Sequence, residues 1–199
     1  NGMLPFKHFY EKADPNRISP DSQQVDSGVS EKALEEASSV ARSCHATVRR
    51  DQSGIGSDAK SKRFEAAKAV KAKEEVALYQ WAKESGLLMS SKEFTVKWES
   101  QGKKGETENE VYYDPEEHAW FKRNNMIYHV TYLEFFQRIH LHNELFPEAP
   151  LEFLGFVVRD KKLWPVCKQQ HIEATRGATH EEVKAHMEKI GFKQIPGTT

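Results

Sequence analysis

The feature that most constrains the fold is a change in hydrophobic periodicity near residue 90. Before this point, apolar side chains recur every three or four residues, which is the spacing of one face of an α-helix. After residue 93 they alternate with polar side chains, as in a half-buried β-strand. The expected order is two helices, three strands, a helix, two strands and a last helix, which predicts an α+β fold with an antiparallel sheet.

Two helices are expected before residue 90. Ser30 is a suitable N-cap for the first one, whose apolar stripe consists of Ala33, Leu34, Ala37, Val40 and Ala41. Because this stripe is narrow and rich in alanine, the helix needs another element to pack against. The second helix can begin at Asp58 and end at Gly86. Its apolar face consists of Phe64, Ala67, Val70, Ala77, Leu78, Trp81 and Ala82.

The first half of the second helix is strongly basic. It carries Lys60, Lys62, Arg63, Lys68, Lys71 and Lys73. Such a stripe can bind nucleic acid or a phosphate. We expect instead a solvated face, because Glu74 and Glu75 restore the charge balance and no aromatic residues lie between the lysines. Binding of DNA or protein through this basic helix, residues 60–73, is the alternative function.

Three strands are expected next, at FTVKW (94–98), VYYD (111–114) and AWFKR (119–123), with a turn around Pro115 between the last two. NMIYHV, residues 125–130, can extend this sheet.

A helix follows at residues 131–146, with Thr131 as its N-cap and Glu134 in the capping-box position. A hairpin is expected next, with its turn at residues 159–162. A short last helix is capped by Thr179 with Glu182 and ends at Gly191.

The composition narrows the cellular setting. The formal net charge of −1 creates no global field that would recruit nucleic acid or a membrane. The two cysteines, Cys44 and Cys167, lie far apart and fit a reducing compartment. No apolar run reaches the length of a transmembrane helix, and no signal peptide is evident. We therefore expect a cytoplasmic protein with no membrane partner.

The order of three strands, one helix and two strands resembles the small N-terminal lobe of protein kinases. The segments LYQWAKESGLL, ENEVYYD, RIHLHNELFPE, LEFLGF and PVCKQQHI together resemble the kinase-like "polyvalent protein" domains of bacterial phages and conjugative elements. The resemblance covers about residues 76–195. It implies a five-stranded antiparallel sheet with one packed helix, preceded by a helical extension. The expected divisions are a polar arm with the first helix (1–57), a helix packed on the next domain (58–90) and the lobe-like domain (91–199).

The resemblance also implies a nucleotide site for ATP with magnesium. Lys122 would contact the phosphates and Glu134 would hold it, while Gly102 and Gly105 would lie in the loop over the phosphates. Gln169 would bind the cofactor from the start of a hinge, QQHIEAT.

Each of these residues also has a plainer interpretation. Lys122 can be a surface lysine beside Arg123, and Glu134 can serve only the capping box with Thr131. The two glycines lack the G-x-G-x-x-G spacing and equally suit a flexible hairpin loop.

The catalytic motifs of kinases are missing from these 199 residues. Neither H-R-D-x-x-x-x-N nor D-F-G occurs, so no residue is expected to accept the substrate proton or hold magnesium. We therefore expect a pseudokinase-like small lobe, either naturally reduced or cut before a catalytic half, that acts for a mobile element through contacts with another protein. Phosphoryl transfer by this chain alone is not expected.

Other candidate sites have weaker patterns. His140 and His142 point to different sides of a helix, so no metal site is expected there. Cys167 and His171 would lie about 13 Å apart on a strand, so the thiol is expected in the core. Asn143 is expected to cap or turn the chain. Most of the following aromatic residues are expected in the core: Tyr112, Trp120, Phe121, Phe135, Phe136, Phe153, Phe156 and Trp164.

Overall fold

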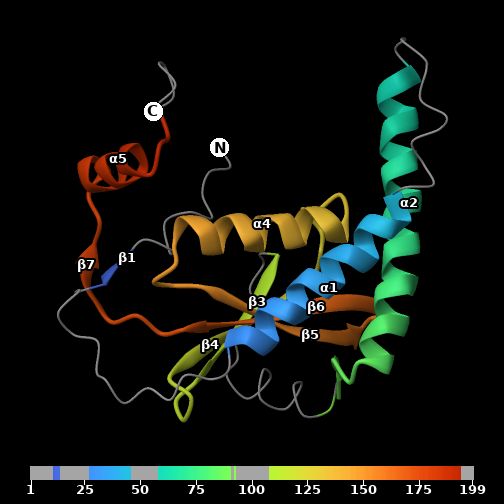
Figure 1. Cartoon of the computed structure of the whole chain (residues 1–199), viewed down its shortest axis with the longest axis horizontal. Coiled ribbons are helices and arrows are strands. Elements are labelled where there is room, and N and C mark those ends of the chain that lie inside the picture. Colours follow the sequence, from blue (N-terminus) through green and yellow to red (C-terminus); the bar gives the residue numbers. More distant parts are fainter. Residues whose placement is uncertain (1–10, 14–26, 46–57, 91, 93–107, 194–199) are drawn as a thin grey trace. The chain divides into compact units, whose positions relative to one another are not determined.

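The computed structural model describes residues 11–13, 27–45, 58–90, 92 and 108–193 (Figure 1). The chain divides into two compact units. The larger one comprises Gln24–Gln170, and the smaller one combines Asn1–Gln23 with His171–Thr199. One of the two boundaries between them, after Gln170, falls within residues 169–175, the segment expected as a hinge.

A five-stranded sheet forms the centre of the larger unit. Its strands, in spatial order, are β2 (Leu88–Met89), β5 (Leu151–Arg159), β6 (Lys162–Gln170), β4 (Ala119–Asn124) and β3 (Asn109–Asp114). All neighbours are antiparallel except β2, which runs parallel to β5, so the sheet is mixed rather than purely antiparallel. The α+β fold resembling a kinase small lobe is thus confirmed, with one correction at the edge strand.

The edge strand β2 was not predicted, and the predicted strand at residues 94–98 lies outside the described residues. β2 depends on a close backbone approach at Gly155, where the register of β5 shifts. Gly155 has φ of +128°, and a Cβ atom there would lie 2.2 Å from the carbonyl oxygen of Leu87. Only glycine can allow this approach, in which the Phe156 N–H donates to the same Leu87 oxygen at 2.9 Å.

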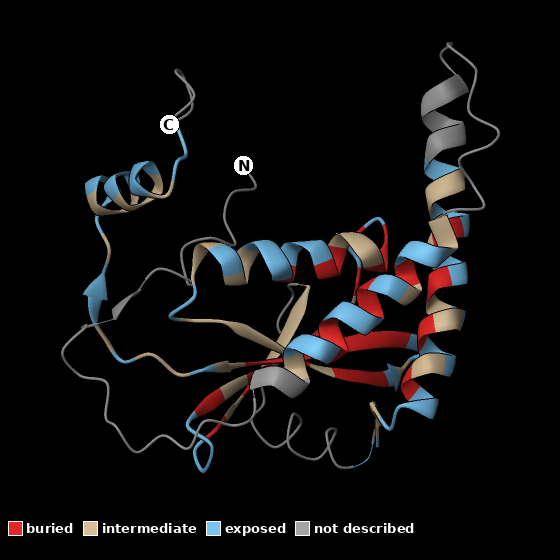
Figure 2. Ribbon diagram, in the orientation of Figure 1, coloured by how far each residue is buried: buried red, intermediate tan, exposed pale blue. Residues whose placement is uncertain are grey.

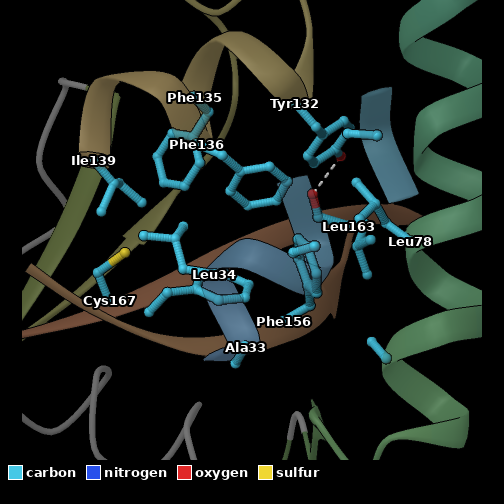
Figure 3. Packing of buried hydrophobic residues seen from close by; sticks show 14 of the residues in the cluster. Ala33, Leu34, Leu78, Tyr132, Phe135, Phe136, Ile139, Phe156, Leu163 and Cys167 are labelled. Atoms are coloured by element: carbon cyan, nitrogen blue, oxygen red, sulfur yellow. Dashed lines mark hydrogen bonds between the residues drawn. The ribbon is translucent and has the colours of Figure 1, made fainter. Parts of the chain in front are cut away.

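Three helices contribute to the core over one face of this sheet. They are α1 (Ser27–His45), α2 (Asp58–Glu84) and α4 (Tyr132–Leu145). The cluster contains Ala33, Leu34, Ala37, Ala41, Leu78, Ala82, Met126, Tyr132, Phe135, Phe136, Ile139, Phe153, Phe156, Leu163 and Cys167. Figure 3 shows these side chains converging between α4, α1 and the strands, and Figure 2 shows buried residues on the inner sides of the helices. More than one helix therefore packs on the sheet.

The alanine-rich stripe of α1 is buried as predicted, and its small side chains let the helix lie close to β5 and α4. The prediction of Ser30 as N-cap is wrong, because the helix already begins at Ser27. The Ser30 hydroxyl instead donates to the carbonyl oxygen of Phe153 at 3.2 Å. Ser30 therefore fastens α1 to β5.

The opposite face of the sheet has its own smaller core. It consists of Tyr112, Ala119, Phe121, Val157, Trp164 and Val166. Arg123 is buried there, is paired with Glu110, and lies 5.9 Å from the centre of the Trp164 ring. Of the eight aromatic residues expected in the core, seven are buried, while Trp120 is partly buried against Tyr113.

The smaller unit contains β1 (Glu11–Ala13), which pairs antiparallel with β7 (Ala174–Gly177), and the helix α5 (His180–Lys189). The predicted capping box is confirmed, since Thr179 and Glu182 exchange both side-chain-to-backbone hydrogen bonds. Gly191 follows the helix with φ of +94°, which fits its predicted role at the helix end.

Candidate functional site

Lys122 lies on an interior strand of the sheet. In β4 it is opposite Val111 of β3 and Cys167 of β6. Cys167 belongs to the core under the helices (Figure 3). Because cross-strand partners share a face, Lys122 lies on the helix-covered face of the sheet. Its Nζ donates to Oε1 of Gln169 at 2.5 Å. Lys122 is therefore not the exposed strand-end lysine of the plainer interpretation.

The surroundings of this ammonium group are poor in water. Burial lowers the pKa of Lys122 to about 8. Burial raises the pKa of the Cys167 thiol to about 12, so the thiol stays neutral. At neutral pH the lysine remains mostly charged, in a place where that charge is poorly hydrated. A charge in such a place needs hydrogen-bond acceptors nearby, and Oε1 of Gln169 is one of them.

Gln169 connects Lys122 to the segment that follows α4. Its Nε2 donates to the carbonyl oxygen of Ala149 at 2.9 Å, and Nε2 of His142 lies at the same distance from that oxygen. Burial lowers the pKa of His142, and the nearby positive charge of Lys122 lowers it further. Gln169 and His142 therefore meet at one carbonyl oxygen beside Lys122.

The end of α4 is held to the sheet by Asn143. Its amide donates to the Leu151 carbonyl oxygen at 3.0 Å and accepts from the Leu151 N–H at 2.8 Å. Leu151 pairs with Gln169 in the sheet. Asn143 thus turns the chain, as expected, and also fixes α4 next to the lysine.

Glu134 is placed differently from its expected role as holder of the lysine. Its N–H donates to the Thr131 hydroxyl at 3.1 Å, so Thr131 caps α4 as predicted. Its carboxylate accepts from the Val130 N–H at 3.0 Å and pairs with Arg138 at 2.7 Å, without forming an ion pair with Lys122. His142 lies two turns later in α4, and the positive charge of Lys122 lowers its pKa.

Sequence reasoning overlooked His142 because it searched α4 for an acid. His142 could have been identified from its position in the last turn of α4, because a short connection leads from this turn into β5. His140, the other half of the H-x-H pair, has Nε2 3.3 Å from the Ser38 hydroxyl. Across the described residues, no group of three or more His, Cys, Asp or Glu side chains could hold a metal ion. Cys167 lies in the core as predicted.

The remaining predicted residues divide into two groups. Gly102 and Gly105 lie outside the described residues, as do the side chains of Lys60, Lys62 and Arg63. Lys68 and Lys73 are exposed. Lys71 donates to two backbone carbonyl oxygens, and Glu74 is fully buried. The expected solvated face is thus seen at Lys68 and Lys73 but not at Lys71, and Glu74, expected only to balance the charge of this stripe, lies in the interior.

No helix in the described part of the chain is long and apolar enough to cross a membrane. Neither the curated proteins nor the solved structures contain a significant match to this chain. A family model does match, over residues 71–198, and its description is Serine/Threonine/Tyrosine Kinase found in polyvalent proteins. The match covers more than half of the chain and confirms the resemblance noted from the segments around Lys122. The chain therefore belongs to the Kinase-PolyVal family of kinase-like domains from polyvalent proteins.

Proposed function

We propose that residues 71–198 form a kinase-type small lobe that holds the phosphates of a nucleotide on Lys122 and works through contact with another protein. The supporting observation is the poorly hydrated ammonium group of Lys122, held by Gln169 on an interior strand. A phosphate oxygen close to Nζ would accept a hydrogen bond from Lys122 in place of Oε1 of Gln169. Because both partners would then be ionised, this hydrogen bond would be stronger than the present one to the uncharged Gln169 amide.

Calorimetric titration with ATP and magnesium tests the nucleotide part of this proposal. We expect binding by the wild type and its loss in Lys122→Met. Lys83→Met is the matched control, because Lys83 is exposed on α2. The absence of any heat or thermal shift with the wild type, under conditions where both lysine variants are folded, would contradict nucleotide binding.

We assign no catalytic residue to this chain, because neither H-R-D-x-x-x-x-N nor D-F-G occurs in its 199 residues. A non-catalytic, pseudokinase-like role in a polyvalent protein of a bacterial mobile element follows as part of the proposal. Incubation with γ-labelled ATP and a general protein substrate should leave both the chain and the substrate unlabelled. Labelling that disappears in Lys122→Met would overturn the non-catalytic assignment.

Binding of DNA or protein by the basic helix, residues 60–73, is the alternative function. Lys68 and Lys73 are free to take part, whereas Lys71 is engaged with backbone carbonyl oxygens. Binding to duplex DNA that weakens steeply as salt rises would favour DNA as the partner. DNA binding that is equally tight in the wild type and in a Lys68→Ala, Lys73→Ala double variant would count against this surface as the binding site.

A further inference from the structure

One turn of α2 binds three separate backbone segments with charged side chains. Lys71, Glu74 and Glu75 lie on one side of the helix, because residues three and four apart are neighbours on its surface. The Lys71 ammonium donates to the carbonyl oxygens of Met126 and His129, both at 2.6 Å. Glu75 accepts from the N–H of Leu163, at the start of β6, at 2.7 Å. This turn, residues 71–75, is called the anchor turn below.

Glu74 is the fully buried member of the anchor turn. Its carboxylate accepts from the N–H groups of Tyr132 and Leu133 at 2.8 and 3.1 Å. Nε2 of His45, the last residue of α1, lies 2.8 Å from the same carboxylate. α1, α2 and α4 therefore meet at one buried carboxylate.

Glu74 lies where it can accept hydrogen bonds from the first N–H groups of α4. The first N–H groups of a helix have no partner within the helix, and this end carries partial positive charge. Thr131 satisfies the N–H of Glu134, and Glu74 satisfies those of Tyr132 and Leu133. The start of α4 is thus capped partly by its own sequence and partly by a side chain of α2.

The other end of α4 lies beside Lys122. Across 14 residues, about 20 Å at the rise of an α-helix, it leads from the Glu74 contact to His142 and Asn143. These two residues bind Ala149 and Leu151, next to Gln169. Since a helix of this length moves as one body, its capped end determines where its last turn lies.

We propose that Glu74 is a positioning residue, through which α1 and α2 place α4 and thereby set the surroundings of Lys122 and Gln169. The family match begins at residue 71 and therefore includes the anchor turn and the part of α2 that follows it. The proposal does not require nucleotide to bind.

All measurements in this test are made on the protein without nucleotide. Glu74→Gln keeps the shape but removes the charge and turns an acceptor into a donor facing other donors. Glu65→Gln is the matched control on an exposed position of the same helix. His45→Gln is a milder variant, because His45 is partly exposed while Glu74 is not. The readouts are the pH midpoint of Lys122 acylation, followed by peptide mass spectrometry, and the pH midpoint of the His142 ring, followed by NMR.

We expect Glu74→Gln to move both midpoints toward the ordinary values of lysine and histidine, with His45→Gln moving them less and Glu65→Gln not at all. A shift of about one pH unit corresponds to a tenfold change in the protonation equilibrium. Lower thermal stability with unchanged midpoints, in whichever of the two variants folds, would overturn the proposal. ATP titration is a separate measurement, so failure of the proposed nucleotide function would be recognised independently.

Discussion

Replacing Lys122 by methionine should stabilise the ligand-free protein, although it removes the residue proposed to bind phosphate. The pKa of Lys122 is about 8, against an ordinary value of 10.5. Each pKa unit corresponds to about 1.4 kcal/mol, so keeping the charge in the folded protein costs about 3 kcal/mol at pH 7. Methionine fills similar space with no charge to desolvate.

An opposing effect reduces this gain. Without Lys122, Oε1 of Gln169 loses the donor that lies at 2.5 Å. Leaving this partly buried acceptor unpaired costs about 1–2 kcal/mol. The net expectation for Lys122→Met is an increase of about 1–2 kcal/mol in the free energy of unfolding at pH 7. Adding Gln169→Leu should remove the unpaired acceptor, while the Ala149 carbonyl oxygen, which also loses the Gln169 donor, keeps its contact with Nε2 of His142.

The lowered pKa of Lys122 also determines how the free energy of unfolding changes with pH. Between pH 8 and 10.5 the unfolded lysine binds more protons than the folded one, so the wild type gains stability as pH rises. The advantage of Lys122→Met should therefore be largest below pH 8 and decline toward pH 10.5. Urea unfolding at a series of pH values measures this, with Lys83→Met as the exposed control. A Lys122→Met protein that is less stable than the wild type by a constant amount at every pH would refute the reasoning.

Three further predictions concern the framework around the site. Gly155→Ala should lower the free energy of unfolding by about 3 kcal/mol or more, because its Cβ would meet the Leu87 oxygen, and thermal unfolding measures this. Asn143→Ala should cost about 2 kcal/mol and speed hydrogen exchange at Leu151, whose N–H and carbonyl groups would lose their partner. Burial lowers the pKa of His129 to about 4. The free energy of unfolding should therefore fall by up to about 3 kcal/mol from pH 6.5 to 4, a decline that His129→Asn should flatten in urea titrations.

Elements with strong local signals were predictable from the sequence. α4 begins after Thr131 as its capping pattern indicates, and β3 and β4 flank the turn at Pro115. The edge strand β2 was missed because two residues, Leu88 and Met89, carry no measurable alternation. Its parallel pairing depends on the absence of a side chain at Gly155, which is a contact between segments far apart in the sequence.

The candidate site was predictable only in part. Lys122 stands out because it lies on the strand before α4, and the structure places it on an interior strand. Its contact with Gln169 could not be derived, since it depends on the diagonal reach of a long side chain across β4 and β6. Which residue of α4 approaches the lysine depends on how far the helix is shifted along the sheet. Long-range packing decides that, and it brings His142 near instead of Glu134.

Glu74 shows why the charge pattern of a helix does not by itself predict which of its charged side chains are buried. Between Lys73, which is exposed, and Glu75, which is partly buried, composition alone indicates a solvated face. A buried carboxylate is tolerated only where donors from elsewhere satisfy it, and here they come from the first turn of α4 and from His45. The need for a further hydrogen-bond acceptor could nevertheless be inferred from the sequence of α4, because Thr131 can satisfy only part of the unpaired N–H groups at a helix start. A helix that begins against a core needs a further acceptor, and acids in the preceding helix are the first candidates to supply it.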